Sequence, residues 1–428
     1  MLWLYRLLFL PALILSSPLY LRRMWRRGGY RENFWQRFGR QPQLPVKHPA
    51  VKRIWLQAVS VGEVLAIGPL LAAWQREGGV EIFLTTTTST GYGLARERYQ
   101  GQTIGIGYFP LDWWYFSARA WRAVQPDLVI LTEGERWPEH IHQAARRGVP
   151  VVCVNARVSD RSFRRMLRVR PMVGPLLGGI TRVLACSTHD AERFRALGFS
   201  AAQITTTGSI KLDVSIPVLS AEEQGRLRRE LGLPVAGLVL MGSSTWEGEE
   251  VALVRALKQA RAAGLACSLL IVPRHAERRA AIELMLRSQG LTYHFRSMRK
   301  AAGEVDVAVG DTTGELRAML QLADVVFVGK SLPPHREGQT PVESAVLGRP
   351  ILFGPGMGNF HTIARELLDV GAAQVVADGE GLATKAIELL RDPARRAAGA
   401  AAGQAWHQQN VGAVARTLAA IRTSLMSD

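Results

Sequence analysis

Two glutamates in the first half of the chain stand where a protein could perform acid–base chemistry. Glu63 comes shortly after residues 54–61 (IWLQAVSV), and Glu133 directly follows residues 127–132 (DLVILT). Runs of this kind are typical of buried strands, so both carboxylates are expected near the carboxyl ends of strands, where α/β proteins bind ligands. Two carboxylates there can supply a general acid and a general base. For Glu63 the alternative stays open that it only stabilises the dipole of the following helix.

A second group of polar residues could bind an anion. Lys211 follows ITTTGSI, and Pro273 and Arg274 follow CSLLIV, so both cations are expected at strand ends. Two loops that contain glycine, 310–315 (GDTTGE) and 338–343 (GQTPVE), run into predicted helices. Such loops can hold a phosphate on backbone N–H groups while a glutamate accepts hydrogen bonds from sugar hydroxyls. Each signal is weak alone, but all share a position at the end of a predicted strand.

Other classes of site are absent from the sequence. There is no G-x-x-x-x-G-K-[ST], no G-x-S-x-G, no H-E-x-x-H and no cluster of Cys and His with metal-ligand spacing. Three cysteines cannot form a fully paired disulfide framework, which favours a reducing compartment. Ser244 and Glu247 have the spacing of a capping box, which predicts that a helix begins there.

The elements that must position these residues form two similar halves. The chain has 428 residues, and its content of 47% hydrophobic and 21% charged residues is ordinary for globular proteins. Predicted strands alternate with amphipathic helices through residues 28–213, and the pattern restarts in residues 221–428 after a segment, 214–220, that suits a linker. This α/β pattern predicts two Rossmann-like domains with parallel sheets that face a central cleft.

The positive charge is concentrated near the N-terminus. The net charge is +17, and residues 1–40 hold eight arginines against one glutamate, while residues 157–170 hold six against one aspartate. Residues 7–21 are uncharged, but as an ideal helix they reach only ~22 Å against a hydrocarbon core of ~30 Å. We expect residues 1–27 to be a membrane anchor at the cytoplasmic face. A buried N-terminal helix, a solvated basic face and a nucleic-acid surface remain alternatives.

A series of short motifs runs along nearly the whole chain. They are Ser60–Glu63, Glu133-x-Glu135-x-Trp137-Pro138, Asn155–Arg157, Gly208-x-x-Lys211-x-Asp213, Thr245-x-Glu247–Glu250, Pro273–His275-x-Glu277-Arg278, Gly310–Thr312-x-Gly314–Leu316 and Asn359-Phe360. In this order they resemble the motifs of 3-deoxy-D-manno-octulosonic acid (Kdo) transferases of lipopolysaccharide assembly.

This resemblance implies the GT-B glycosyltransferase fold, a CMP-Kdo donor, and a lipid A precursor as acceptor at the cytoplasmic face of the inner membrane. It also implies inversion at the anomeric carbon, no cofactor or metal, and no nucleic acid as partner. By motif, Glu63 resembles the general base, and Glu133 and Lys211 resemble the pair that stabilises the transition state. The implied nucleotide contacts are Pro273, Arg274, Thr313, Gly314, Glu315, Thr340, Pro341, Val342 and Glu343.

Three residues depart from the family pattern. Trp246 replaces a histidine, Lys330 replaces a glycine, and Thr340 replaces an asparagine and so removes an amide from an expected nucleotide contact. Two alternatives therefore stay open. One is another GT-B enzyme with a UDP donor, and the other is a non-enzymatic protein that binds anionic lipid or nucleic acid through its arginines.

Overall fold

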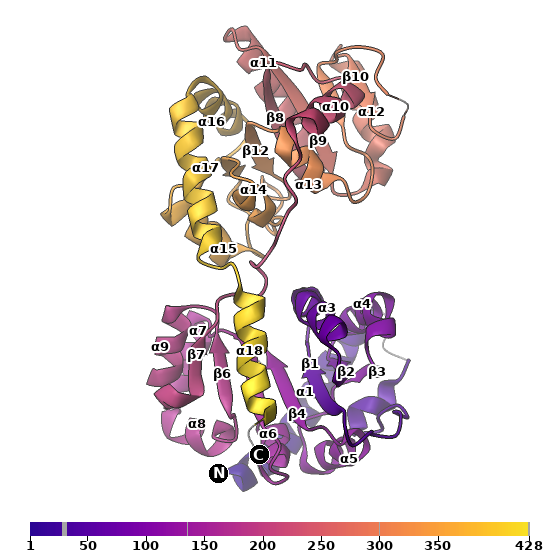
Figure 1. The fold of residues 1–428 in the computed structure, drawn as a ribbon, viewed down its shortest axis with the longest axis vertical. Coiled ribbons are helices and arrows are strands. Elements are labelled where there is room, and N and C mark those ends of the chain that lie inside the picture. The colour runs from indigo at the N-terminus through magenta and orange to yellow at the C-terminus, as the bar shows by residue number, and fades with distance from the viewer. Residues whose placement is uncertain (28–31, 135, 299, 427–428) are drawn as a thin grey trace. The chain divides into compact units, whose positions relative to one another are not determined.

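The chain forms two compact units, each built on its own sheet (Figure 1). The computed structural model describes residues 1–27, 32–134, 136–298 and 300–426, and it gives the backbone alone for residues 19–21, 23–27 and 426. Unit 1 consists of Met1–Asp213 with Gly412–Asp428, and unit 2 consists of Val214–Val411.

Unit 1 contains a seven-stranded parallel sheet with the order β3-β2-β1-β4-β5-β6-β7. Its strands are β1 (Lys52–Gln57), β2 (Val80–Thr86), β3 (Gly105–Tyr108), β4 (Leu128–Thr132), β5 (Val151–Ala156), β6 (Arg182–Ala185) and β7 (Ile204–Thr206). Its helices are α1 (Leu2–Arg27), α2 (Val61–Ala66), α3 (Gly68–Glu77), α4 (Ser89–Tyr99), α5 (Trp114–Val124), α6 (Pro138–Ala145), α7 (Asp160–Arg168), α8 (Arg170–Leu177), α9 (Thr188–Ala196) and α18 (Ala413–Met426).

The central strands of unit 1 are largely apolar because helices cover both faces of the sheet. Side chains alternate between the faces. Ile54 and Leu56 therefore pack with α2, α3 and α18, whereas Trp55 packs with α5 and α6. Burial on both sides explains why these strands show continuous hydrophobic runs instead of alternation.

Unit 2 repeats this architecture with the strand order β10-β11-β9-β8-β12-β13-β14. Its strands are β8 (Leu238–Thr245), β9 (Cys267–Pro273), β10 (Tyr293–Phe295), β11 (Val307–Val309), β12 (Val325–Val328), β13 (Ile351–Phe353) and β14 (Ala373–Val375). Its helices are α10 (Ala221–Leu231), α11 (Glu249–Ala262), α12 (Arg279–Ser288), α13 (Leu316–Met319), α14 (Val342–Val346), α15 (His361–Asp369), α16 (Gly379–Arg391) and α17 (Pro393–Gln408).

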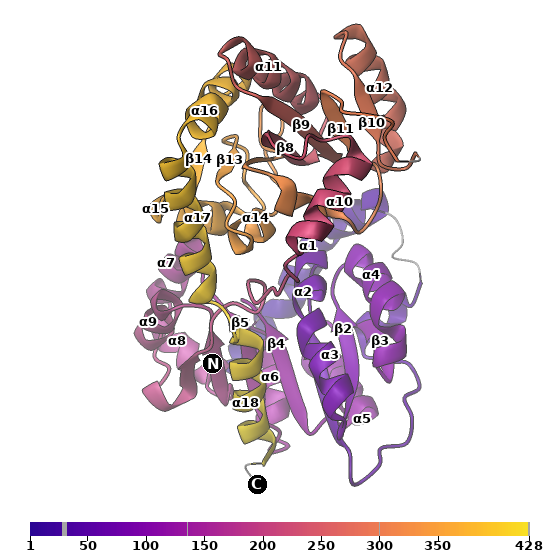
Figure 2. The same cartoon turned by 45° about the horizontal axis from the view of Figure 1, so that its top comes forward.

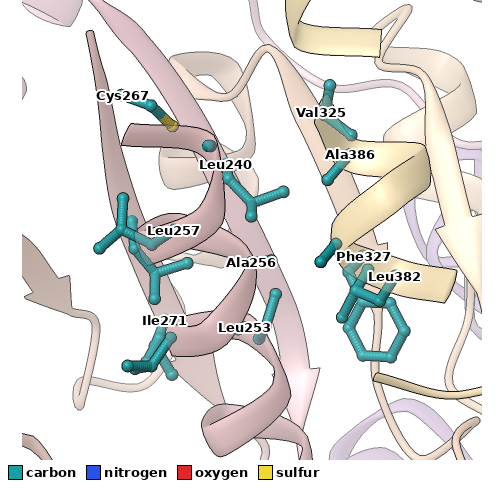
Figure 3. Packing of buried hydrophobic residues seen from close by; sticks show 14 of the residues in the cluster. Leu240, Leu253, Ala256, Leu257, Cys267, Ile271, Val325, Phe327, Leu382 and Ala386 are labelled. Carbon is teal, nitrogen blue, oxygen red and sulfur yellow. The ribbon is translucent and has the colours of Figure 1, made fainter. Parts of the chain in front are cut away.

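Helices α11 and α16 lie side by side on one face of the unit 2 sheet (Figure 2). Leu253 of α11 and Leu382 of α16 belong to the same buried cluster as Leu240, Ile271 and Phe327 of the strands (Figure 3). The two predicted Rossmann-like sheets are therefore confirmed as parallel seven-stranded sheets.

The C-terminal helix departs from the expected division of the chain. The sequence places all of 221–428 in the second domain, but α18 packs on the sheet of unit 1 (Figure 1). The side chain of Asp213 accepts hydrogen bonds from Gly412 N (3.0 Å) and Val414 N (2.7 Å), which joins the start of α18 to unit 1. An amphipathic helix shows in its sequence which face is buried, but not which sheet buries it.

We predict that Ile421→Ala destabilises unit 1, although residue 421 lies at the far end of the sequence. Ile421 is 0% exposed in the core beside Ile54 and Ile210. Its truncation should lower the free energy of unfolding by about 2–5 kcal/mol. Hydrogen exchange should show the loss of protection in β1 and β5. Leu284→Ala, on a side chain that is 71% exposed, is the control and should change little. Loss of protection in unit 2 instead would contradict the assignment.

Candidate active site

The order of strands in unit 1 reverses between β1 and β4, which are neighbours in the sheet. The chain runs outward from β1 to β2 and β3 on one side, and from β4 to β5, β6 and β7 on the other. Ligands of open parallel sheets bind outside the carboxyl ends of the strands at this switch point. Glu63, in the first turn of α2, follows β1, and Glu133 directly follows β4.

Glu63 is buried at this switch point and accepts three hydrogen bonds. Its side chain is only 7% exposed. Its Oε2 accepts hydrogen bonds from Val59 N (2.9 Å) and from the hydroxyl of Thr132, and its Oε1 accepts one from Ser60 Oγ (3.1 Å). Thr132 is the last residue of β4, so this carboxylate links the two strands that flank the switch point. A role limited to the helix dipole would not require that link.

Burial raises the pKa of Glu63 above its ordinary value, because it disfavours the charged carboxylate. The hydrogen bonds from Thr132, Val59 and Ser60 act in the opposite direction, because they stabilise the charged form. The negative charge of Glu133 adds to the upward shift. A carboxylate with a raised pKa is a stronger base than an exposed one, which suits proton abstraction.

Glu133 and Lys211 form an ion pair beside Glu63. Glu133 has a left-handed backbone, with φ of 53°, at the turn out of β4. Residues other than glycine adopt this conformation at an energetic cost, and such residues are frequent at functional sites. The structure thus brings the three predicted catalytic residues of unit 1 to one end of the sheet. Glu135, which was also named in the sequence motif, lies outside the described residues.

Asn155 positions the segment that carries Lys211, a role that sequence reasoning missed. Asn155 lies near the end of β5, is buried, and has φ of 51°. Its Oδ1 accepts hydrogen bonds from Ile210 N (3.1 Å), Ser209 Oγ (3.2 Å) and Cys186 Sγ (3.2 Å). The available signal was an asparagine just inside the end of an apolar run, because asparagine tolerates the left-handed conformation.

The predicted nucleotide contacts of unit 2 lie at the ends of strands of its sheet or in the segments that follow them. Pro273 is the last residue of β9, and the exposed Arg274 follows it and donates its N–H to Thr245 O (3.1 Å). Thr313 and Gly314 are exposed in the loop after β11. These residues therefore share the carboxyl edge of the parallel sheet, as the sequence predicts.

Two further predicted nucleotide contacts, Glu315 and Thr340, already form hydrogen bonds with other residues of unit 2. Glu315 pairs with Arg296 (2.9 Å) and accepts the hydroxyl hydrogen of Thr312, and the hydrogen bond from Arg296 holds its pKa below the ordinary value. The hydroxyl of Thr340 accepts a hydrogen bond from Val342 N (3.3 Å).

The other three residues of the 340–343 loop differ in their burial and in their neighbours. Pro341 and Val342 are buried, and Glu343 lies 3.6 Å from Arg317. The loop thus presents mainly its backbone and the side chains of Thr340 and Glu343.

The predicted capping box at Ser244 and Glu247 is wrong. Ser244 belongs to β8, and α11 begins at Glu249 after Gly248, which makes no side-chain cap. The carboxylate that holds the backbone in place here belongs to Glu249, which is 1% exposed. It accepts hydrogen bonds from the backbone N–H groups of Trp246 (2.9 Å), Lys330 (2.8 Å), Ser331 (2.8 Å) and Leu332 (3.1 Å). Sequence spacing cannot identify this role, because three of the four donors lie more than 80 residues away.

Metal ligands do not gather in the part of the chain that the structure describes: no three His, Cys, Asp or Glu residues there are arranged to hold an ion.

We predict a defined order of pKa shifts at Glu63. Thr132→Val should raise the pKa of Glu63 further, because it removes a hydrogen bond to the charged form, and Ser60→Ala should raise it by less. Glu133→Gln should lower it, because a neighbouring negative charge is lost. Carbon-13 NMR titration of labelled glutamate carboxyls measures these shifts, and Glu63→Gln identifies the signal. An unchanged pKa in Thr132→Val would show that this hydroxyl does not bind the carboxylate.

Comparisons with known proteins agree with this geometry. The family model "3-Deoxy-D-manno-octulosonic-acid transferase (kdotransferase)" matches residues 32–214, which lie almost wholly in unit 1. The 3-deoxy-D-manno-octulosonic acid transferase of Bordetella pertussis is 34% identical over 95% of this chain and 96% of its own length. The transferase of the same description from Haemophilus influenzae is 30% identical over 96% of this chain and 93% of its own length.

Solved structures with little sequence identity share the fold. Anabaena HepE in complex with UDP has a TM-score of 0.52 at 16% identity, and covers 87% of this chain and 99% of its own. UDP-GlcNAc 2-epimerase from Neisseria meningitidis has a TM-score of 0.53 at 11% identity, and covers 88% of this chain and 100% of its own. The GT-B fold is thereby confirmed. With relatives aligned over nearly its whole length, the chain belongs to the 3-deoxy-D-manno-octulosonic acid transferase family of glycosyltransferases.

Proposed function

We propose that this protein transfers Kdo from CMP-Kdo to a lipid A precursor, with inversion at the anomeric carbon. The observation that carries the proposal is the buried Glu63 carboxylate, whose pKa is raised, at the switch point of unit 1 beside the Glu133–Lys211 pair. Membership of the Kdo transferase family supports Kdo as the sugar. The same membership favours an enzyme over a non-enzymatic protein that binds anions through its arginines.

In this mechanism Glu63 removes the proton from the acceptor hydroxyl as that oxygen attacks the anomeric carbon. The new carbon–oxygen bond forms while the bond from the anomeric carbon to the CMP phosphate breaks, and CMP leaves with the electron pair. General-base catalysis of this kind contributes typically ~10²–10⁴ in rate. One displacement inverts the anomeric carbon and forms no covalent intermediate. Glu133 pairs with Lys211, and Asn155 holds the backbone beside it. Lys211 therefore supplies a fixed positive charge that stabilises the negative charge developing on the departing phosphate.

The donor is proposed to bind unit 2 without a metal ion. Arg274 is exposed at the end of β9 and carries the charge that a phosphate requires. The proposed contacts with the nucleotide are Pro273, Arg274, Thr313, Gly314, Glu315, Thr340, Pro341, Val342 and Glu343. A UDP donor is the alternative outcome, and binding assays with CMP and UDP separate the two.

Helix α1 offers a surface that could associate with a membrane, and we propose that this membrane surface is the cytoplasmic face of the inner membrane. Tyr5 donates a hydrogen bond to Asp112 (2.6 Å) and Arg6 pairs with Glu139 (2.7 Å), which hold the first turns of α1 on unit 1. The opposite face leaves an apolar stripe exposed, at helical spacing, and its members are Leu4, Leu7, Leu8, Ile14 and Leu15. Among the described residues, no helix is both long and apolar enough to cross a membrane. An exposed apolar stripe of this kind is suited to lie in the membrane interface.

Aromatic and basic side chains beside α1 add to this surface. Trp3 and Trp114 line a hollow of ≈ 690 Å³ together with Arg6, Arg146 and Arg147. Tryptophan and arginine are the side chains that favour the boundary between hydrocarbon and lipid headgroups. Arg22 is exposed, whereas Arg37 is buried against Tyr108, so the basic N-terminal segment is only partly available to lipid. Arg31 and the side chains of Arg23, Arg26 and Arg27 lie outside the described residues.

We predict that Glu63→Gln abolishes Kdo transfer while CMP binding persists, because the proposed nucleotide contacts belong to unit 2. Incubation with CMP-Kdo and lipid A precursor, followed by mass spectrometry of the lipid, measures transfer. Calorimetry with CMP measures binding. The matched control is Glu97→Gln, which makes the same chemical change on an exposed face of α4. Retention of more than about a tenth of wild-type kcat in Glu63→Gln is incompatible with a general base.

We predict that the combined substitutions Leu7→Ser, Leu8→Ser, Ile14→Ser and Leu15→Ser release the protein from membranes. These four side chains are exposed, so folding should be unaffected, and each apolar side chain buried in lipid contributes ~1.5–3 kcal/mol. Sedimentation with neutral and anionic vesicles measures partition. Leu284→Ser removes an exposed leucine from unit 2 and should partition like the wild type. If the fourfold variant sediments with both kinds of vesicle as much as the wild type does, the stripe on α1 is not an anchor.

A further inference from the structure

The two residues at the switch point of unit 2 are Trp246 and Lys330. The strand order of this sheet reverses between β8 and β12. Trp246 directly follows β8, and Lys330 comes two residues after β12. The ammonium of Lys330 lies 4.1 Å from the centre of the Trp246 ring, which is a cation–π contact.

The backbone around Lys330 is held firmly, so the place of its side chain is set by the fold. Lys330 has a left-handed backbone with φ of 57°, a conformation that favours glycine. Its N–H donates to Glu249 Oε2 (2.8 Å). At the preceding Gly329, a Cβ atom would come within 2.4 Å of Ser244 O, so the loop packs tightly on the end of β8. Because glycine would suit this backbone better, the lysine must be explained by its side chain.

The side chains around Lys330 offer hydrogen-bond donors and positive charge. Among the described residues, the ionic neighbour of the ammonium is Glu337 at 3.9 Å, beyond hydrogen-bond distance. The indole Nε1 of Trp246 is buried, and no described residue accepts its hydrogen. The rings of His275 and His335 lie 5.2 Å and 5.9 Å from the ring of Trp246. A loosely paired ammonium and an unused N–H at a strand end are suited to an oxyanion.

We propose that Lys330, seated on Trp246, binds an oxyanion of the nucleotide donor and is a residue that determines donor affinity in this chain. The oxyanion is either the phosphate or the carboxylate of the sugar, since both have the same recognition chemistry. This inference rests on the proposed function, because it takes a nucleotide sugar as the ligand of unit 2. Glu249 is a positioning residue here, because it acts only through the backbone of the loop.

Calorimetry with three ligands tests the proposal on the full-length protein. Cytidine carries neither oxyanion, CMP carries the phosphate, and CMP-Kdo carries the phosphate and the sugar carboxylate. Lys330→Ala and Lys330→Gly should each weaken the binding of CMP-Kdo about tenfold or more, because a charged hydrogen bond is lost, and should leave the affinity for cytidine unchanged. A loss that already appears with CMP identifies the phosphate, and a loss confined to CMP-Kdo identifies the carboxylate. Lys330→Arg keeps the positive charge and should retain most of the affinity.

Two controls separate binding from structure. Lys330→Gly relieves the left-handed backbone, so it should melt no lower than the wild type while it binds more weakly. Lys258→Ala removes the same charge from an exposed site on α11 and should bind like the wild type. The proposal is overturned if Lys330→Ala and Lys330→Gly bind CMP and CMP-Kdo as tightly as the wild type does. It is also overturned if these two variants lose affinity for cytidine by the same factor as for CMP and CMP-Kdo. If the wild type binds neither CMP nor CMP-Kdo, the proposed function itself fails, which is a different result.

Discussion

A buried glutamate that receives hydrogen bonds from across a switch point is the constraint on which both units depend. Glu63 lies in the first turn of the helix after β1 and binds Thr132 of β4, while Glu249 begins the helix after β8 and binds the loop after β12. Burying a carboxylate is unfavourable unless hydrogen bonds satisfy it. Each glutamate therefore ties together the two strand ends at which an open parallel sheet binds its ligand.

The carboxylates of Glu63 and Glu249 differ in the kind of group that donates hydrogen bonds to them. All four recorded hydrogen bonds to Glu249 come from backbone N–H groups, so the residue organises a loop and leaves the chemistry to others. Glu63 receives two of its three hydrogen bonds from hydroxyl groups, and burial keeps its pKa above the ordinary value. Hydroxyl groups can rotate away when a substrate arrives, whereas backbone groups cannot. A buried glutamate of this kind is thus the proposed base in unit 1, whereas in unit 2 it organises a loop.

Helix α18 and the first turns of α1, from opposite ends of the chain, both pack on unit 1. The first turns of α1 are held through buried polar groups, and burial raises the pKa of the Asp112 carboxyl that receives Tyr5 to about 6. Helix α18 completes the core on one face of the sheet through Leu418 and Ile421. The unit that carries the proposed base is therefore also the one joined to the apolar stripe of α1. This arrangement suits the lipid acceptor that we propose.

The sequence by itself determined the two parallel sheets, the family, and the strand-end positions of Glu63, Glu133, Lys211 and Arg274. It could do so because an apolar run and the polar residue after it are local features of the chain. Only the tertiary structure decided that Thr132 bonds to Glu63, 69 residues away, that Glu249 and not Glu247 is the structural carboxylate, and that α18 belongs to unit 1. Periodicity shows which face of an element is buried, but the partner that buries it is chosen by packing between segments far apart in sequence.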